Sequence, residues 1–160
     1  MNPVIFKAYD IRGRYPEELD ALAARAIGRA TAAFIKKQSS VKRAKIVVSR
    51  DARHSSPELE QAVVKGLRES GADIIKTGLA STPLFYFSVN AARAHGGLMV
   101  TASHNPKEWN GLKIVSSGAL PIGLASGLEE IKAIAESGSF PPAKAKGSIK
   151  SKNFLKSYVR

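Results

Sequence analysis

The hydrophobic and polar positions of this chain alternate between helical and strand-like patterns. The region 16–37 opens on a proline, which suits a first helical turn. Apolar side chains then recur at helical spacing, at Leu19, Leu22, Ala26, Ala30 and Phe34. Acidic residues near the start and lysines near the end favour the helix dipole. The pattern predicts a first helix that begins near Pro16 and ends near Lys37.

Short apolar runs bounded by polar or glycine-containing loops are typical of strands that are buried on both faces. Runs of this kind cover residues 45–49, 73–77 and 98–101. A helix that starts at Pro57 and stops before Gly71 follows the first run, and a helix opened by Pro83 follows the second. This alternation predicts a mostly parallel sheet with helices on both faces.

The remaining segments complete the predicted fold. Residues 112–115 form a strand too close to the previous one for a helical crossover, so it pairs antiparallel or turns away. A last helix is expected over 123–137, and a linker or extended edge strand over 140–151. We predict an α/β fold, a three-layer α/β/α sandwich with a mostly parallel, mixed sheet. Residues 1–138 form its domain, and 139–160 form a basic linker that begins the junction to a second domain.

Composition narrows the class of protein. The chain has 160 residues, enough for one domain with a real core, and no cysteine. Disulfides, thiolate metal sites and a cysteine nucleophile are therefore excluded. The first ten residues lack the pattern of a signal peptide, and no stretch approaches the ~18 apolar residues of a membrane span. We expect a cytoplasmic protein with no membrane partner.

The net charge of +12 raises the possibility of a nucleic-acid or polyanion-binding module. Half of this excess lies at the end of the chain, where no acidic residue follows Glu136 and six basic residues do: Lys144, Lys146, Lys150, Lys152, Lys156 and Arg160. No nucleic-acid-binding motif is present. We expect no nucleic-acid partner, and polyanion binding stays open as an alternative.

Parallel sheets bind ligands at the carboxyl ends of their strands, which selects the loops 50–55, 78–82 and 102–110. Ser103 follows a buried strand and is well placed for a nucleophile. A serine hydrolase is not indicated, because the GxSxG motif is absent and His104 is expected to be poorly placed to bond the neighbouring hydroxyl as a triad base.

Separate motifs in this chain carry a resemblance to a known family. TASHNP at 101–106, followed by NGLK at 110–113, resembles the phosphoserine loop of the α-D-phosphohexomutases. FKAYDIRG at 6–13 and SRDAR at 49–53 are similar to two further motifs of the same family, in the same order. These enzymes include phosphoglucomutase, phosphomannomutase and phosphoglucosamine mutase, and the resemblance is to their N-terminal domain I.

The resemblance implies a reversible phosphoryl shuttle between the 1- and 6-positions of a hexose phosphate. Ser103 would carry the phosphate, Lys113 would act as general base or acid, and His104 would position the phosphate or the reacting hydroxyl. Cations and polar groups would surround the phosphate, with the substrate-binding set being Tyr9, Arg12, Arg50, Arg53 and Asn105. Phosphoryl transfer depends on such positioning and charge neutralisation.

The same resemblance implies Mg²⁺, held by the phosphate on Ser103 together with an aspartate-rich DxDxD loop that this chain lacks. It also implies a hexose 1,6-bisphosphate intermediate and further mutase domains as partners. We expect the chain alone to fold without mutase turnover. The preferred sugar stays open, phosphoglucosamine mutase included, and so does a non-catalytic interaction or regulatory domain.

Overall fold

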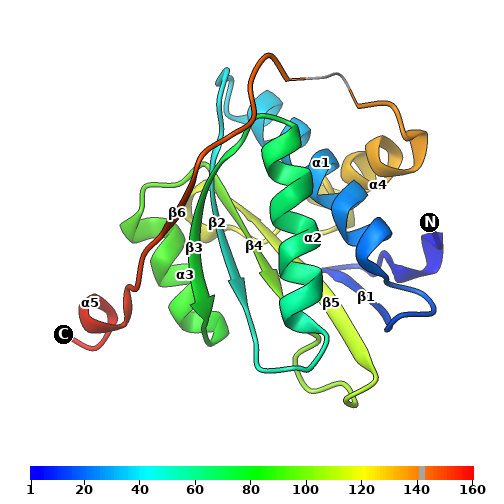
Figure 1. The fold of residues 1–160 in the computed structure, drawn as a ribbon, viewed down its shortest axis with the longest axis horizontal. Helices are drawn as coiled ribbons and strands as arrows, with labels where there is room; N and C mark the ends of the chain where they lie inside the picture. The colour runs from blue at the N-terminus through cyan, green and yellow to red at the C-terminus, as the bar shows by residue number, and fades with distance from the viewer. Residues whose placement is uncertain (141–142) are drawn as a thin grey trace.

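The computed structural model describes residues 1–140 and 143–160, and its centre is a six-stranded mixed sheet (Figure 1). The strand order is β1-β5-β4-β2-β3-β6. The strands are β1 Ile11–Arg14, β2 Lys45–Arg50, β3 Asp73–Leu79, β4 Gly96–Val100, β5 Trp109–Ser116 and β6 Ile149–Ser151. Strands β4, β2, β3 and β6 run parallel, whereas β5 is antiparallel to both β4 and β1. The predicted mixed sheet is confirmed.

Helices cover both faces of this sheet. Helices α1 Ala21–Gln38, α2 Ser56–Glu69 and α4 Leu128–Ser137 pack on one face, and α3 Thr82–Ala91 packs on the other (Figure 1). The pleat of β2 separates two cores: Val48 joins the larger cluster beneath α1 and α2, and Val47 packs with Phe85 of α3. The short helix α5 Leu155–Tyr158 follows β6. These layers confirm the predicted α/β/α sandwich.

The first helix begins later than predicted, at Ala21. The carboxylate of Asp20 accepts a hydrogen bond from the backbone N–H of Ala23 at 2.7 Å and so caps the helix at this point. Leu19 therefore lies outside the helix, and its spacing to Leu22 carries no information about a helical face. Leu22 is 74% exposed, so its place in the predicted apolar face is wrong.

The predicted helix over 123–137 is divided in two. A 3-10 turn spans Leu124–Ser126, and α4 begins at Leu128. Gly127 separates them with a φ of 133°, a conformation that favours glycine. It also lies against the ring of Phe34, where a β-carbon would be 2.2 Å from the ring Cζ. Close packing on α1 thus explains the break.

The segment 140–151, predicted as a linker or extended edge strand, contributes β6 to the sheet beside β3. Pro141 and Pro142 of that prediction lie outside the described residues. The carboxylate of Asp73 accepts hydrogen bonds from the backbone N–H and the hydroxyl of Ser148, at 2.8 and 2.7 Å. These bonds attach the segment to the start of β3.

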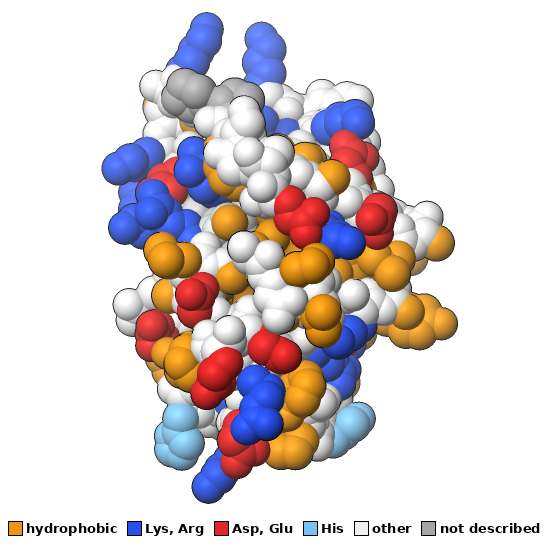
Figure 2. Space-filling view, turned by 90° about the vertical axis from the view of Figure 1, so that its right-hand side faces the viewer, with side chains coloured by type: hydrophobic (Ala, Val, Ile, Leu, Met, Phe, Trp, Pro, Cys, Tyr) orange, Lys and Arg blue, Asp and Glu red, His pale blue; other side chains and the backbone are white. Residues whose placement is uncertain are grey.

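The charges on the face at the right of Figure 1 are of both signs. Figure 2 shows acidic and basic side chains interspersed over this face, with apolar side chains between them.

Within the part of the chain that the structure describes, no helix combines the length and the apolar character needed to cross a membrane.

Candidate active site

Ser103 lies in the loop of residues 101–108, here called the serine loop, which joins β4 to β5 at the carboxyl end of β4. Its side chain is exposed, and its φ of 57° is in the left-handed region, which costs a residue with a β-carbon about 1–2 kcal/mol. The backbone N–H of Ser103 donates to the hydroxyl of the buried Thr101 at 3.0 Å. The hydroxyl of Ser103 is thus presented to solvent on a fixed backbone.

The side chain of Arg53 fixes the backbone of the serine loop through hydrogen bonds. Its Nε donates to the carboxylate of Asp51 at 3.2 Å. Its Nη1 and Nη2 donate to four backbone carbonyl oxygens at 2.7–3.1 Å, those of Ser103, Asn105, Pro106 and Trp109. These bonds use all five N–H groups of the guanidinium. The guanidinium of Arg53 is therefore fully used by Asp51 and by backbone carbonyls of the serine loop and of Trp109, the first residue of β5.

A buried polar network supports the same loop from the start of α2. The side-chain amide of Asn110, fully buried, donates to the hydroxyls of Ser55 and Ser56 at 2.8 and 3.0 Å. Ser56 in turn donates to Asp51. The sequence motif contains Asn110, but the motif did not indicate that its side chain would bond to the start of α2. A buried amide with partners for both donors fixes β5 against α2.

Asp10 joins the cationic side chains of the site. Its buried carboxylate accepts hydrogen bonds from Nε and Nη2 of Arg12 at 2.9 and 2.8 Å. It also accepts a longer hydrogen bond, 3.4 Å, from Nζ of Lys113. Arg12 also donates through Nη1 to the side-chain oxygen of Asn105 in the serine loop. The structure thus brings together Arg12, Asn105 and Lys113. Asp10 was missed as a site residue, and its position two residues before Arg12 was the available signal.

The arrangement depends on a close approach of β1, β5 and the serine loop at Gly111. A β-carbon there would lie 2.3 Å from the carbonyl oxygen of Ile11 and 2.8 Å from that of Thr101. Real β-carbons do not come this close to backbone atoms. Glycine at 111 therefore allows β1, with Arg12, to lie beside the loop.

The ring of His104 lies beside the hydroxyl of Ser103. The hydroxyl oxygen lies 3.3 Å from Nδ1 and 3.1 Å from Nε2. Because these two ring nitrogens point in diverging directions, one oxygen nearly equidistant from both is aligned with neither. The contact therefore lacks the alignment of a triad, and it places the imidazole beside the hydroxyl of Ser103.

Comparison with known proteins agrees with this arrangement. The model of the phosphoglucomutase/phosphomannomutase family, α/β/α domain I, matches residues 3–142. The chain belongs to this family. A phosphomannomutase of Salmonella montevideo is 40% identical over 160 residues, covering 99% of this chain and 34% of the relative. A phosphomannomutase of Klebsiella pneumoniae is 42% identical over 156 residues, covering 96% of each.

A solved structure has the same fold. The phosphoglucomutase/phosphomannomutase family protein of Burkholderia thailandensis superposes with a TM-score of 0.88 at 34% identity, over 99% of this chain and 35% of that one. The chain thus spans about a third of the length of this protein and of the Salmonella relative. As a member of the family, the chain corresponds to its domain I.

The other two members of the predicted phosphate-binding set, Tyr9 and Arg50, make no hydrogen bond to Arg12, Asn105 or Lys113 within the described part of the chain. Tyr9, two residues before β1, is 82% exposed. The side chain of Arg50 donates to the carbonyl oxygen of Asp51 at 3.2 Å, and its Nε lies 3.8 Å from the carboxylate of Glu60 on α2. Since Glu60 belongs to the helix layer opposite α3, the structure places the side chain of Arg50 on the other face of the sheet from Lys113.

The side chains near Ser103 offer few oxygen ligands for a metal ion. Among residues 1–140 and 143–160, no group of three or more His, Cys, Asp or Glu side chains could hold an ion. Asp10 supplies the carboxylate beside Arg12 and Lys113, and its Oδ2 already pairs with both of these cations. Mg²⁺ takes about six oxygen ligands. The described side chains therefore do not form a Mg²⁺ site by themselves.

Proposed function

We propose that this chain is the phosphoryl-carrying domain of an enzyme that interconverts hexose 1-phosphate and hexose 6-phosphate, with Ser103 as the carrier. The observation that supports this most strongly is the exposed hydroxyl of Ser103, held by a loop whose backbone is bound by Arg53, close to cationic side chains. Phosphoryl transfer requires this combination of a fixed nucleophile and positive charge.

In the forward step the bond between phosphorus and Ser103 Oγ breaks while a bond from phosphorus to a sugar hydroxyl oxygen forms. The sugar hydroxyl loses a proton and Ser103 Oγ gains one, so the step balances, and a bisphosphorylated sugar results. Lys113 is proposed as the general acid or base of this proton transfer. His104, whose ring nitrogens lie 3.1 and 3.3 Å from Ser103 Oγ, is proposed to position the phosphate. Reversal with the other phosphate returns the serine to its phosphorylated form.

The remaining roles follow from position. Arg12 and Asn105 are joined by a hydrogen bond beside the loop and are proposed to bind the phosphate. Tyr9, exposed two residues before β1, is proposed to contact substrate. Arg53 contributes by holding the loop. The proposal includes Mg²⁺ bound through the phosphate on Ser103 and completed by residues of further domains, where it would neutralise phosphate charge.

The test is phosphopeptide mass spectrometry after incubation with glucose 1,6-bisphosphate and Mg²⁺, performed on this chain and on the polypeptide encoded by the whole source gene. We expect phosphate on Ser103 and mutase turnover in the longer polypeptide, and no turnover in this chain alone. Ser103→Ala should abolish both phosphorylation and turnover. Ser139→Ala, an exposed serine far along the chain, is the control. Unchanged turnover in Ser103→Ala would refute the proposal.

A further inference from the structure

A second cationic hollow lies between α2, β3 and β6. Its volume is about 380 Å³, and the polar side chains around it include Arg50, Glu60, Lys76, Ser151, Lys152 and Asn153. The hollow is on the face of the sheet that α2 covers, whereas Arg12 and Lys113 share the pleat positions of Met99 and Val115, which face α3. The hollow is therefore separate from the site at Ser103.

Glu60 is the unusual member of this hollow. The residue is 4% exposed, and one carboxylate oxygen, Oε2, lies 3.0 Å from Nζ of Lys76 and 3.8 Å from Nε of Arg50. The other oxygen, Oε1, is buried and has no hydrogen-bond partner within the described part of the chain. A buried acceptor without a donor is costly and therefore calls for an explanation.

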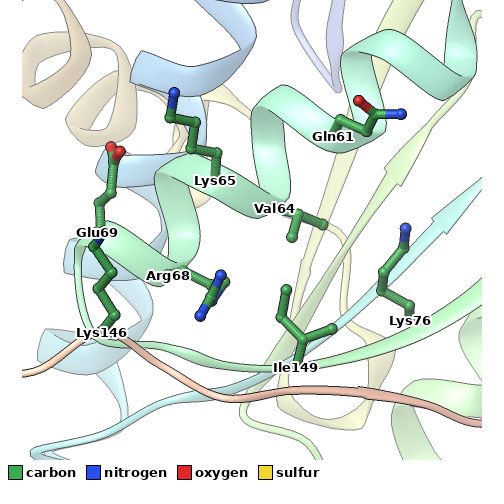
Figure 3. Close-up of a pocket in the computed structure, with 8 residues that line it drawn as sticks. All are labelled: Gln61, Val64, Lys65, Arg68, Glu69, Lys76, Lys146 and Ile149. Carbon is green, nitrogen blue, oxygen red and sulfur yellow. The ribbon is translucent and has the colours of Figure 1, made fainter.

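The charges around Glu60 do not balance. Arg50, Lys76 and Lys152 supply three positive charges against the one carboxylate of Glu60. Lys76 also lines the neighbouring hollow, whose basic side chains are Lys65, Arg68 and Lys146 (Figure 3). Figure 3 shows the ammonium group of Lys76 directed toward α2. The neighbouring hollow also contains the carboxylate of Glu69, which Arg25 pairs with at 2.7 Å, so the charge that remains there is positive. An anion is the ligand that this field favours.

We propose that this hollow binds a phosphate group that still carries a proton or an adjacent hydroxyl, from inorganic phosphate or a phosphate monoester. The cations bind the anionic oxygens. Oε1 of Glu60 is closed off from solvent in this structure, so binding includes a shift of the neighbouring Lys76 and Lys152 side chains that lets Oε1 accept the hydrogen bond from the O–H of the ligand. Sulfate has the same shape but carries no proton near neutral pH, so Glu60 repels it. The hollow should therefore discriminate phosphate from sulfate. This proposal does not rest on the function proposed for Ser103.

The test is a titration of this chain followed by backbone amide NMR at neutral pH and constant ionic strength. Inorganic phosphate should shift the amides of Gly78, Ser151 and Asn153 saturably, with sulfate at least about tenfold weaker. Glycerol 3-phosphate distinguishes the source: tighter binding than inorganic phosphate identifies a monoester site, and weaker binding identifies an inorganic phosphate site. Absent shifts at these amides, or equal affinity for sulfate, would overturn the proposal.

Variants separate the roles of the side chains. Lys76→Met should lower the affinity for inorganic phosphate at least about tenfold. Glu60→Gln should abolish the discrimination and let sulfate bind as well as phosphate, because the amide offers a donor and no charge. Lys132→Ala, on α4, is the matched control and should change nothing. Ser103→Ala should also leave these shifts unchanged, so failure here is distinct from failure of the phosphoserine proposal. Unchanged discrimination in a folded Glu60→Gln would refute the role of Oε1.

Discussion

The guanidinium Nη2 of Arg53 lies 2.8 Å from the backbone carbonyl oxygen of Ser103, a residue 50 positions further along the chain. The same guanidinium binds the carbonyls of Asn105, Pro106 and Trp109. The conformation of the serine loop is therefore determined by a side chain that follows β2, in addition to the local sequence. A residue that would be assigned to phosphate binding on charge alone acts on the backbone that carries the nucleophile.

Replacement of Arg53 should loosen the loop without removing any group from the site. Arg53→Ala leaves four carbonyls without this donor, and Arg53→Lys restores part of the charge but lacks the planar fork. Hydrogen bonds from charged donors contribute about 1.5–3 kcal/mol each and are not additive. We expect Arg53→Ala to lower the free energy of unfolding by at least about 2 kcal/mol in urea titrations.

Amide hydrogen exchange over residues 103–109 should rise at least about tenfold in the same variant, and Arg53→Lys should lie between the two. Arg14→Ala removes an exposed arginine of β1 and serves as the control. If exchange in the loop is the same in Arg53→Ala as in the unmodified chain, Arg53 does not hold the loop.

Asp10 should contribute to stability through charge. In Asp10→Asn the side chain keeps its shape, but Arg12 and Lys113 lose the carboxylate that they share and repel each other. We expect a loss of about 1–2 kcal/mol in the free energy of unfolding at low salt. Salt screens like-charge repulsion, so the deficit should shrink at high ionic strength.

Glu17→Gln removes an exposed acidic side chain and is the control for the loss of one negative charge. Equal effects of salt on Asp10→Asn and Glu17→Gln would show that the carboxylate of Asp10 has no specific role between the two cations.

The layers and the position of Ser103 were predictable because they depend on local patterns. Apolar runs determine which segments are strands, and the carboxyl ends of parallel strands meet at one edge of the sheet. The direction of Arg50 was not predictable, because the pleat of β2 turns it toward Glu60 and away from the loop that its neighbour Asp51 supports. The start of α1 was misplaced because Pro16 was taken as the first helical residue, whereas the side chain of Asp20 caps the helix and starts it at Ala21.

Gly111 should tolerate no side chain. In Gly111→Ala the new β-carbon would meet the carbonyl oxygens of Ile11 and Thr101 at 2.3 and 2.8 Å, which forces β1 away from β5. We expect a loss of about 3 kcal/mol or more in the free energy of unfolding. Gly138→Ala is the control: its φ of 62° alone costs about 1–2 kcal/mol, and nothing lies within 4 Å of the added carbon. Similar losses in both variants would argue against the close approach.

The attachment of β6 should depend on pH through Asp73. Burial raises the pKa of this carboxyl, but hydrogen bonds from the backbone and side chain of Ser148, with the charges of Arg43 and Lys150, outweigh it and hold the pKa below the usual 3.8. A carboxyl whose pKa is lower in the folded state contributes stability above its unfolded pKa, and this contribution is lost as the pH falls through the folded value.

We therefore expect the amides of Ile149–Ser151 to keep their positions in NMR spectra from neutral pH down to about pH 4, the usual range of an aspartate. Below this pH the chemical shifts of these amides should move toward those of an unpaired strand, whereas the chemical shifts of the β2 amides should not change. Asp73→Asn removes the titrating group, so its β6 amides should show no transition over the same range. A transition of equal size in Asp73→Asn would mean that another group controls the pairing of β6 with β3.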